Sequence, residues 1–537
     1  MLLALAAAPR AVALDPACAD AVANAPFAGV DELRAWHQIM ADLGPRPTAG
    51  EAQRRWLGWL REQLLRVPGL EVRVDSYALE PRQLEQRATL NLFTSDDSRR
   101  TIPTAGPIPY AALTDRRGVE AALAYVPAGE SITASVAAGR IVIRELRPLG
   151  VPYALLQQVA SYWYDPRHTL APDALYEREH LSHQTLDDLK AAAAAGAAGL
   201  VMVQEFPRAQ IAGQYQPYRG EVWPIPGVFL GADEGRTLID LARGDTAPRA
   251  RLTTRGFSRR ADTSNLIATL PGAGPEKIVV ASHTDGMNPL WDNGPLAMLA
   301  LAQQFAALPA ACRPRALEFA FTTAHLYLSA HGAARYAESL VPACDTVSLV
   351  VVLEHLGANE FLAVPRQDGV GRVLTPSGLP ELTFIFATPT AAILDAAGAS
   401  VTQHDLERVA VVPFTAGIAN GEGKAYESRG FPTLAAIAAP WTLRTPAFGM
   451  ETVNVEAMRR MTLAFRDMIM QLQNVPRATI SGGRTCRSIA AEAARGGRRS
   501  GSPCSGRRCA SASPSLGCAG VPTPLASGDR PPARRSP

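Results

Sequence analysis

Strands made almost entirely of apolar residues alternate with helix-like segments over residues 262–472. The runs KIVVASH (277–283), ALEFAFTT (316–323) and VSLVVVL (347–353) are too apolar to expose one face to water. Helix-like segments such as GPLAMLALAQQFAAL (294–308) separate them. Near-continuous apolar strands connected by helices are typical of a parallel sheet covered on both faces. The pattern therefore predicts an α/β fold with a mostly parallel mixed sheet flanked by helices.

The remainder of the chain differs from this region in composition, and the differences indicate five parts. Residues 1–28 form an N-terminal segment, and residues 29–117 contribute two amphipathic helices and a strand to the main domain. Residues 118–255 hold short β runs, the helix-like TLDDLKAAAAAGAAG and a loop rich in Gly, Tyr, Gln and Pro, which indicates an inserted β-rich domain. Residues 256–476 carry the α/β pattern. Residues 477–537 are Arg, Ser, Gly, Pro and Ala without a period, which predicts a disordered basic tail.

The formal net charge of +3 is unevenly distributed. The predicted tail holds eleven arginines and two acids, so the body of the chain is mildly acidic. An acidic body argues against nucleic acid as the partner. No apolar run reaches the roughly 18 residues that a membrane-spanning helix needs, so no membrane-spanning segment is expected.

The compartment is left open between two alternatives. The start, MLLALAAAPRAVALD, has an apolar run but no positively charged region before it, so it is a weak signal peptide. Export to the periplasm or the extracellular space and an apolar, partly disordered N-terminus both fit. Cys312 and Cys344 each stand shortly before a predicted strand. In an exported protein they could pair with each other, whereas two unrelated buried thiols are the simpler interpretation.

Side chains that can bind a metal stand at the ends of the predicted strands, where ligands collect in open parallel sheets. His283 and Asp285 follow the strand KIVVAS, Asp292 precedes a helix, and Glu354 follows VSLVVVL. One imidazole and two carboxylates form a sound ligand set for a catalytic zinc that keeps a position for water. Such a zinc lowers the pKa of the water and polarises a carbonyl. We predict His283, Asp292 and Glu354 as the metal ligands.

Longer motifs follow one another in the order LGPRPTAG, HTD, WDNGPLAMLA, LEFAFTT, LEHLG and FPTLAAIAAPWTLRTP. This order, over about residues 30–472, resembles the co-catalytic zinc aminopeptidases, a family that includes glutamate-carboxypeptidase-like and transferrin-receptor-like proteins. AGAAGLVMV followed by IPGVFLGADEGRTL resembles the protease-associated domain that is often inserted in such peptidases. The resemblance implies a zinc-exopeptidase fold. It also implies that His283 binds the first metal, that Asp285 orients its imidazole, and that Asp292 bridges two metals; Glu354 stands where the family usually has an aspartate.

The second half of the family's metal site is incomplete in this sequence. The family usually has a Glu-Glu pair after the strand that matches LEFAFTT, and here His325 and Leu326 stand in its place. The family's last histidine ligand aligns with Arg444 in WTLRTP. Leucine cannot bind a metal and arginine stays protonated. One zinc is therefore expected rather than two, or none if the site has decayed.

Two functions follow from this incomplete site. In the first, the protein is an aminopeptidase-like metallohydrolase that acts on peptide or amide bonds with one metal. His325 then serves as the general base, because imidazole suits proton transfer near neutral pH, and Arg444 supplies a fixed cation near the position of the lost metal. In the second, the protein is a catalytically inactive binding or receptor-like protein with this fold. Arg444 would then pair with a carboxylate such as Asp292 in an empty site. The oligomeric state is left open by both.

The remaining polar candidates receive modest roles. Glu422 and Tyr426, in the run GIANGEGKAYESRGFP, are expected to line the pocket. Two further histidines of the α/β region are expected to be packing or surface groups, and three in the inserted domain are expected at its surface, since none has the spacing of metal ligands; these are His331 and His355, then His168, His180 and His183.

Overall fold

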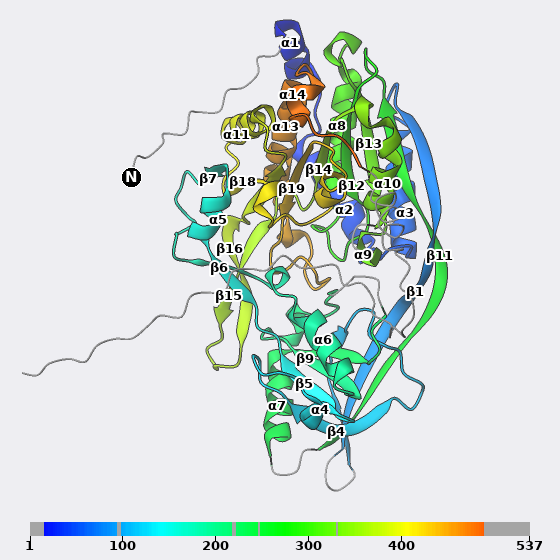
Figure 1. Ribbon diagram of the computed structural model, residues 1–537, viewed down its shortest axis with the longest axis vertical. Helices are drawn as coiled ribbons and strands as arrows, with labels where there is room; N and C mark the ends of the chain where they lie inside the picture. The colour runs from blue at the N-terminus through cyan, green and yellow to red at the C-terminus, as the bar shows by residue number, and fades with distance from the viewer. Residues whose placement is uncertain (1–14, 94–97, 217–221, 245–247, 329–330, 488–537) are drawn as a thin grey trace, which may run out of the picture. The chain divides into compact units, whose positions relative to one another are not determined.

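The computed structural model describes residues 15–93, 98–216, 222–244, 248–328 and 331–487 (Figure 1). These residues belong to one compact unit, Met1–Ile489. The amphipathic segments near the start form helices α2 (Val30–Asp42) and α3 (Glu51–Leu64), as the sequence predicts.

A large mixed sheet forms the centre of the molecule. Its strands, in spatial order, are β11 (Arg249–Leu270), β13 (Ala316–Thr322), β12 (Lys277–His283), β14 (Val347–Leu353), β19 (Thr433–Ala438), β17 (Thr383–Ala387), β18 (Val409–Pro413) and β7 (Tyr162–Tyr164). The pairs β13–β12, β12–β14, β14–β19 and β17–β18 are parallel. The pairs β11–β13, β19–β17 and β18–β7 are antiparallel. The prediction of a mostly parallel mixed sheet is confirmed.

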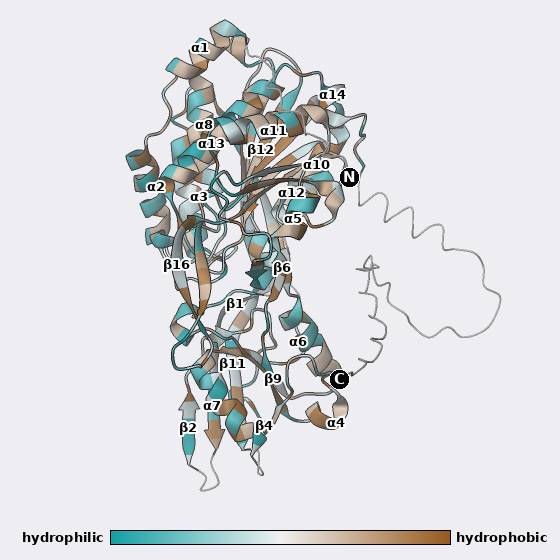
Figure 2. Ribbon diagram, turned by 90° about the vertical axis from the view of Figure 1, so that its left-hand side faces the viewer, coloured by the Kyte–Doolittle hydropathy of each residue, from teal (hydrophilic) through white to brown (hydrophobic). Residues whose placement is uncertain are grey.

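Both faces of this sheet are buried, which explains why its strands are apolar throughout. Ile278 and Val280 of β12 belong to a hydrophobic cluster with α8 (Gly294–Ala307) and α13 (Val455–Leu472). Val279 and Ala281 of the same strand point the other way, into a cluster with α10 (His331–Leu340). In Figure 2 the strands around β12 are coloured largely as hydrophobic. Side chains that alternate between two covered faces leave no position for a polar stripe.

Two very long strands join the central sheet to the inserted region. Strand β1 (Glu71–Phe93) pairs with β11 in antiparallel register along nearly its whole length (Figure 1). At the far end β11 pairs with a small parallel sheet of β4 (Val119–Tyr125), β5 (Ile141–Glu145), β9 (Gly199–Val203) and β10 (Gly227–Leu230). Helices α6 (Gln184–Ala194) and α7 (Ala232–Arg243) belong to the same region. The insertion thus contains helices as well as strands, and its assignment as a protease-associated domain stays a prediction.

Part of the insertion returns to the central sheet. After β6 (Leu149–Pro152) and α5 (Tyr153–Val159), strand β7 pairs with β18 at the edge of that sheet, and β8 (Leu175–Arg178) then pairs with β6. Arg178 makes an ion pair of 2.6 Å with Glu381, and both side chains are buried. A buried pair of this kind holds the returning segment, residues 147–182, against the main body.

The remaining elements complete the fold, and two of them begin at or next to residues of the site, one at His325 and one directly after Glu422. They are α1 (Pro16–Asn24), β2 (Arg99–Ile102), β3 (Gly106–Pro107), α4 (Ala134–Ala137), α9 (His325–Leu328), β15 (Asn359–Pro365), β16 (Arg372–Pro380), α11 (Ala391–Gln403), α12 (Gly423–Glu427) and α14 (Arg477–Ser481).

Two disulfides replace the cysteine pairing that the sequence suggests. Cys312 pairs with Cys18, and Cys344 pairs with Cys486. The preferred interpretation of two unrelated buried thiols and the alternative of a Cys312–Cys344 bond are therefore both wrong. Each true partner lies in a terminal segment that the sequence gives little reason to place near a strand. The bond to Cys486 also shows that the folded part extends past residue 477, where a disordered tail is predicted to begin.

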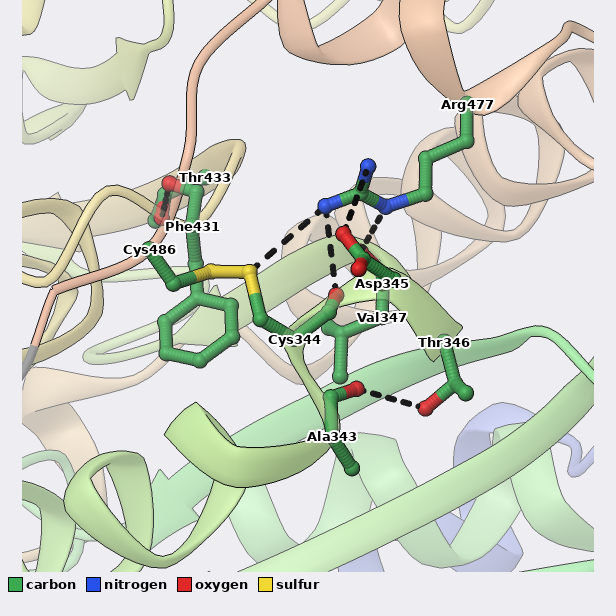
Figure 3. The surroundings of a disulfide bond; sticks show 9 residues. All are labelled: Ala343, Cys344, Asp345, Thr346, Val347, Phe431, Thr433, Arg477 and Cys486. Atoms are coloured by element: carbon green, nitrogen blue, oxygen red, sulfur yellow. Dashed lines mark hydrogen bonds and ion pairs between the residues drawn. A yellow bond between two sulfur atoms is a disulfide. The ribbon is translucent and has the colours of Figure 1, made fainter.

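The Cys344–Cys486 bond lies beside an arginine that helps to fix the end of the folded part (Figure 3). The guanidinium of Arg477 donates to the carbonyl oxygens of Cys344 and Val347 at 3.2 and 3.1 Å. It also lies 3.7 Å from the carboxylate of Asp345.

Among the described residues, no helix is long and apolar enough to span a bilayer.

Candidate metal centre

The candidate ligands lie at the carboxyl ends of neighbouring parallel strands. His283 is the last residue of β12, and Glu354 and His355 directly follow β14, the next strand in the sheet. His325 follows β13 on the other side of β12. Parallel neighbours end at the same edge, so residues distant in sequence meet there.

Three ligand atoms converge at this edge, one each from His283, Glu354 and His355. These atoms all lie within 4.8 Å of one another, and the three residues are buried. His283 Nε2 and Glu354 Oε2 are 3.6 Å apart. Neither of these atoms nor His355 Nε2 has a hydrogen-bond partner among the described residues. Buried polar atoms without partners are costly, and three that converge in this way fit the ligand set of a divalent cation.

The main chain fixes both imidazoles in the tautomer that a metal requires. His283 Nδ1 lies 2.9 Å from the carbonyl oxygen of Asp285, and His355 Nδ1 lies 2.5 Å from that of Ala438. A carbonyl oxygen only accepts, so each Nδ1 carries the proton and donates it. Each Nε2 therefore presents a lone pair to the centre.

His355 is part of this group although the sequence pattern assigns it to packing or the surface. Its φ of +57° lies in the left-handed region, which is unusual for a residue with a side chain. Strained backbone of this kind is concentrated at functional sites. Its position directly after Glu354 was the one sequence signal available, and it became informative only when the turn was known.

Asp292, the third predicted ligand, is held by an arginine. Arg46 Nη2 lies 2.6 Å from Asp292 Oδ1, and Arg46 Nε lies 2.9 Å from Oδ2. Both side chains are fully buried. Asp292 is not a member of the converging group, and its role as a ligand stays a prediction. Arg444, proposed from the sequence as a partner of Asp292, instead donates to Gln216.

Asp285 contacts His283 through its main chain rather than its carboxylate. Its carboxylate Oδ1 is 4.0 Å from His283 Nδ1. The carboxylate accepts from Thr48 Oγ1 at 2.5 Å and from the backbone N–H groups of His325 and Leu326 at 3.2 and 3.0 Å. Burial raises the pKa of Asp285 to about 7, although these hydrogen bonds oppose the shift. Asp285 therefore ties the loop after β13 to the centre.

His325 and Glu422 form a second polar pair beside the ligands. The ring of His325 stacks on that of His283, with centroids 3.9 Å apart and an interplanar angle of 13°. Its Nδ1 lies 3.5 Å from Glu422 Oε1. Glu422 also accepts from Thr322 Oγ1, and its backbone N–H donates to Glu354 Oε1 at 2.8 Å. The expectation that Glu422 lines the site agrees with this placement, whereas Tyr426 lies in the hydrophobic cluster beneath.

Burial shifts the pKa of the three converging groups, and of His325 and Glu422 beside them, towards the neutral form. Burial, and then the charge of Glu422, raise the pKa of Glu354 well above its usual value. Burial lowers the pKa of His283 and of His355 well below the usual value. Burial, followed by the charge of Arg444, lowers the pKa of His325 to about 3, and burial raises that of Glu422 to about 8. A divalent cation bound here would favour the carboxylate forms of Glu354 and Glu422 and would bind both imidazoles in their neutral form.

Solved structures with the same architecture are zinc aminopeptidases and related peptidases. The zinc aminopeptidase BSAP from Bacillus subtilis shares 15% identity at a TM-score of 0.58, over 85% of this chain and 98% of that one. The peptidase M28 precursor from Shewanella amazonensis SB2B shares 14% at 0.57, over 82% and 95%. The aminopeptidase from Aneurinibacillus sp. strain AM-1 shares 15% at 0.52, over 86% and 95%. The chain has the zinc-exopeptidase fold.

No family model matches the sequence, and no curated protein matches it either. At this identity the likeness shows the zinc-exopeptidase fold alone. The three structures are covered almost completely, so the likeness includes the inserted region and not only the central sheet.

Three other histidines were expected at the surface of the insertion. His168 and His183 are exposed. His180 is only partly exposed and stacks edge-on against Tyr176, with centroids 6.0 Å apart. It lies close enough to His355 and Arg444 for their charges to lower its pKa further, after burial. The side chain of His331 lies outside the described residues.

Proposed function

We propose that this protein is a metallohydrolase with the zinc-exopeptidase fold that cleaves peptide or related amide bonds with a single metal ion. The observation that carries the proposal is the set of three buried, convergent ligand atoms without partners, His283 Nε2, Glu354 Oε2 and His355 Nε2. Two imidazoles and one carboxylate are the donor set of a catalytic zinc site.

The residues of this centre fit such an ion. His283, Glu354 and His355 would hold it, and Asp292 would join them only on release from Arg46. When bound, the zinc would lower the pKa of a water and polarise the carbonyl of the scissile amide. The main-chain carbonyls that accept from the two Nδ1 atoms would keep the Nε2 lone pairs of both imidazoles directed at the ion.

One ion is supported rather than two. The position of the family's metal-binding glutamate is Leu326, whose backbone N–H donates to Asp285. The position of the family's last histidine ligand is Arg444, whose charge already acts on His325. An apolar side chain and a permanent cation cannot hold a second zinc.

Proton transfer falls to His325 and Glu422. His325 is neutral near pH 7, so its imidazole can accept a proton from a nucleophilic water. A pKa of about 3 makes it a weak base, however. A bound divalent cation would favour the carboxylate form of Glu422, and that carboxylate, 3.5 Å away, could accept the proton from the His325 imidazolium. Arg444 would stabilise negative charge that develops on the substrate.

A second candidate function is favoured by one observation. Arg46 neutralises Asp292, so the aspartate that would bridge two metals is already satisfied without any. A centre stabilised in this way suits a peptidase fold that binds and does not cut. Under either function the two disulfides support an exported protein, because such bonds persist in oxidising compartments.

Metal content and turnover test the proposal together. Purified full-length protein should contain about one zinc per chain and should hydrolyse amino-acid amides. His283→Ala and His355→Ala should each lose both properties, and His168→Asn, a change at an exposed histidine, should lose neither. A metal-free protein that gains no turnover with added zinc or cobalt would contradict the proposal and support the binding protein.

A further inference from the structure

The loop after β13 leads into α9, carries His325 and packs against the inserted region. Ala324 and Tyr327 of this loop lie in one buried hydrophobic cluster with Tyr110 and Phe229. Phe229 is part of β10, and Tyr110 lies between β3 and β4, in the segment that leads into the insertion. The candidate base therefore stands on a loop that shares its packing with the insertion.

The main chain of this loop is strained, and three hydrogen bonds hold it. Ala324 has a φ of +64°, in the left-handed region that residues with a side chain rarely adopt. The carboxylate of Asp285 accepts from the N–H groups of His325 and Leu326, at 3.2 and 3.0 Å. The hydroxyl of Tyr110 donates to the carbonyl oxygen of Leu326 at 3.0 Å. Strained backbone persists only where the surrounding contacts fix it, so these bonds set the direction of the His325 side chain.

Tyr110 is itself held in a conformation that few residues adopt. Its φ is +62°, and only 2% of its surface is exposed. The Oε1 atom of Gln86 accepts from its N–H at 3.0 Å, and the N–H of Trp223 donates to its carbonyl oxygen at 2.8 Å. Buried residues with a positive φ cost free energy and are concentrated at functional sites. This strain places the Tyr110 hydroxyl against the carbonyl of Leu326.

The same hydroxyl belongs to a chain of contacts that leads to Arg444. The hydroxyl of Tyr215 donates to that of Tyr110 at 3.4 Å, and their rings meet edge-on with centroids 6.4 Å apart. The N–H of Tyr215 donates to the carbonyl oxygen of Arg444 at 2.8 Å. Tyr110 thus connects the loops of His325 and Arg444, to which the proposed reaction assigns proton transfer and charge stabilisation.

We propose that Tyr110 is a positioning residue of the metal centre, which holds the carbonyl of Leu326 and thereby keeps the imidazole of His325 stacked on His283. The ring centroids of the two histidines are 3.9 Å apart, so a small shift of the loop would separate them. The inference rests on the proposed function for the part that His325 plays in proton transfer. It gives the segment that leads into the insertion a role in setting the proton acceptor.

Hydrogen exchange in metal-free, full-length protein tests the positioning without any turnover. Tyr110→Phe removes only the hydroxyl. In a peptide covering residues 322–328, the amides of His325 and Leu326 should exchange about five- to tenfold faster, because one hydrogen bond no longer holds the loop closed. The amides of β14 should keep their wild-type rates. Tyr125→Phe, which removes a hydroxyl that is hydrogen-bonded elsewhere in the insertion, is the matched control and should change neither region.

Turnover by zinc-loaded protein tests whether this position matters for the reaction. With L-leucinamide, Tyr110→Phe should lower kcat about tenfold and leave KM and zinc content within about twofold of the wild type, because the proton acceptor alone is displaced. In a His325→Ala background the same change should lower kcat by less than about twofold, since Tyr110 acts through His325. Partial unfolding would instead lower the zinc content and reduce turnover equally in both backgrounds.

A second variant keeps the test decisive if Tyr110→Phe does not fold. Gln86→Met removes the amide that holds the main chain of Tyr110, so it should speed exchange of the same two amides by a smaller factor. Unchanged exchange at His325 and Leu326 in a folded variant, or an equal fall of kcat with and without His325, would overturn the inference. Faster exchange in a protein that neither holds zinc nor hydrolyses amides would uphold the positioning while the proposed function fails.

Discussion

Arg46 donates a hydrogen bond to each carboxylate oxygen of Asp292, at 2.6 and 2.9 Å, in a fully buried ion pair. The same guanidinium donates to the carbonyl oxygen of Asn288 at 2.8 Å and to that of Met40 at 3.1 Å. The pair thus joins the loop after α2 to the loop before α8, next to the metal centre. In the sequence these residues belong to the motifs LGPRPTAG and WDNGPLAMLA, whose separation of more than two hundred residues conceals the contact.

Removing Arg46 should destabilise the protein strongly, because the buried carboxylate of Asp292 would lose the guanidinium that pairs with it. We expect Arg46→Met to lower the free energy of unfolding by about 3–5 kcal/mol, and Arg46→Met with Asp292→Asn to recover more than half of it. Urea unfolding of metal-free protein measures both. Arg34→Met is the control: Arg34 is exposed and 3.9 Å from Asp31, so its loss should matter by less than ~1 kcal/mol. If Arg46→Met and Arg34→Met lowered the free energy of unfolding equally, the stabilising role assigned to the Arg46–Asp292 pair would be contradicted.

Alanine substitutions at two glycines, Gly421 and Gly417, can distinguish the effect of backbone strain from the effect of a contact with the metal centre. Gly421 and Gly417 have φ values of +78° and +77°, so alanine at either should cost about 1 kcal/mol of stability. A Cβ at Gly421 would lie 2.4 Å from Glu354 Oε1, whereas one at Gly417 meets nothing within 4 Å. Gly421→Ala should therefore weaken zinc binding, by about 10- to 100-fold, and Gly417→Ala should leave it unchanged. Competition with a fluorescent chelator measures both affinities, and matching values would show that Glu354 is not a ligand.

His37 should make the protein less stable as the pH falls below 6.5. It is fully buried, its Nε2 donates to the carbonyl of Pro289 at 2.8 Å, and burial lowers its pKa to about 4. The unfolded chain, with the ordinary value of 6.5, binds the proton first. Between pH 6.5 and 4 stability is therefore lost, up to about 3 kcal/mol. Other groups titrate in this range, and burial of Asp285 acts in the opposite direction.

The His37 contribution is isolated by a variant that keeps the hydrogen bond. The amide of His37→Gln can donate to Pro289 without titrating. As the pH falls from 7 to 4, the wild type should lose more of its free energy of unfolding than His37→Gln does. Parallel curves over this range would show that His37 is accessible to protons in the folded state.

The central sheet was predictable from sequence because burial on both faces leaves its mark on every residue of a strand. A strand as apolar as KIVVASH has to be buried on both faces, and its last residue, His283, then lies at the carboxyl edge of the sheet. The ligand set was less predictable, because Glu354 and His355 are adjacent and an extended strand would point them to opposite faces. Only the left-handed turn at His355 brings its Nε2 to the centre.

Contacts between distant loops were beyond the reach of the sequence. The choice of Arg46 over Arg444 as the partner of Asp292 depends on which loop reaches the aspartate, and no local pattern encodes that. Cys18 and Cys486 pair with strand-proximal cysteines from segments whose composition suggests disorder. His180 lies in an insertion, and its place beside the metal centre follows from β7 joining the central sheet.

The two disulfides should stabilise the fold to slightly different extents. Cys18–Cys312 closes a loop of 294 residues and Cys344–Cys486 one of 142. Each bond restricts the unfolded chain, so the double variants Cys18→Ala/Cys312→Ala and Cys344→Ala/Cys486→Ala should each lose about 2–5 kcal/mol in urea unfolding. Because the first loop is about twice as long, its variant should be the less stable by roughly 0.6 kcal/mol. If the first variant instead lost almost nothing, α1 would have to detach before the rest of the protein unfolds, and Cys18 would restrain only that helix.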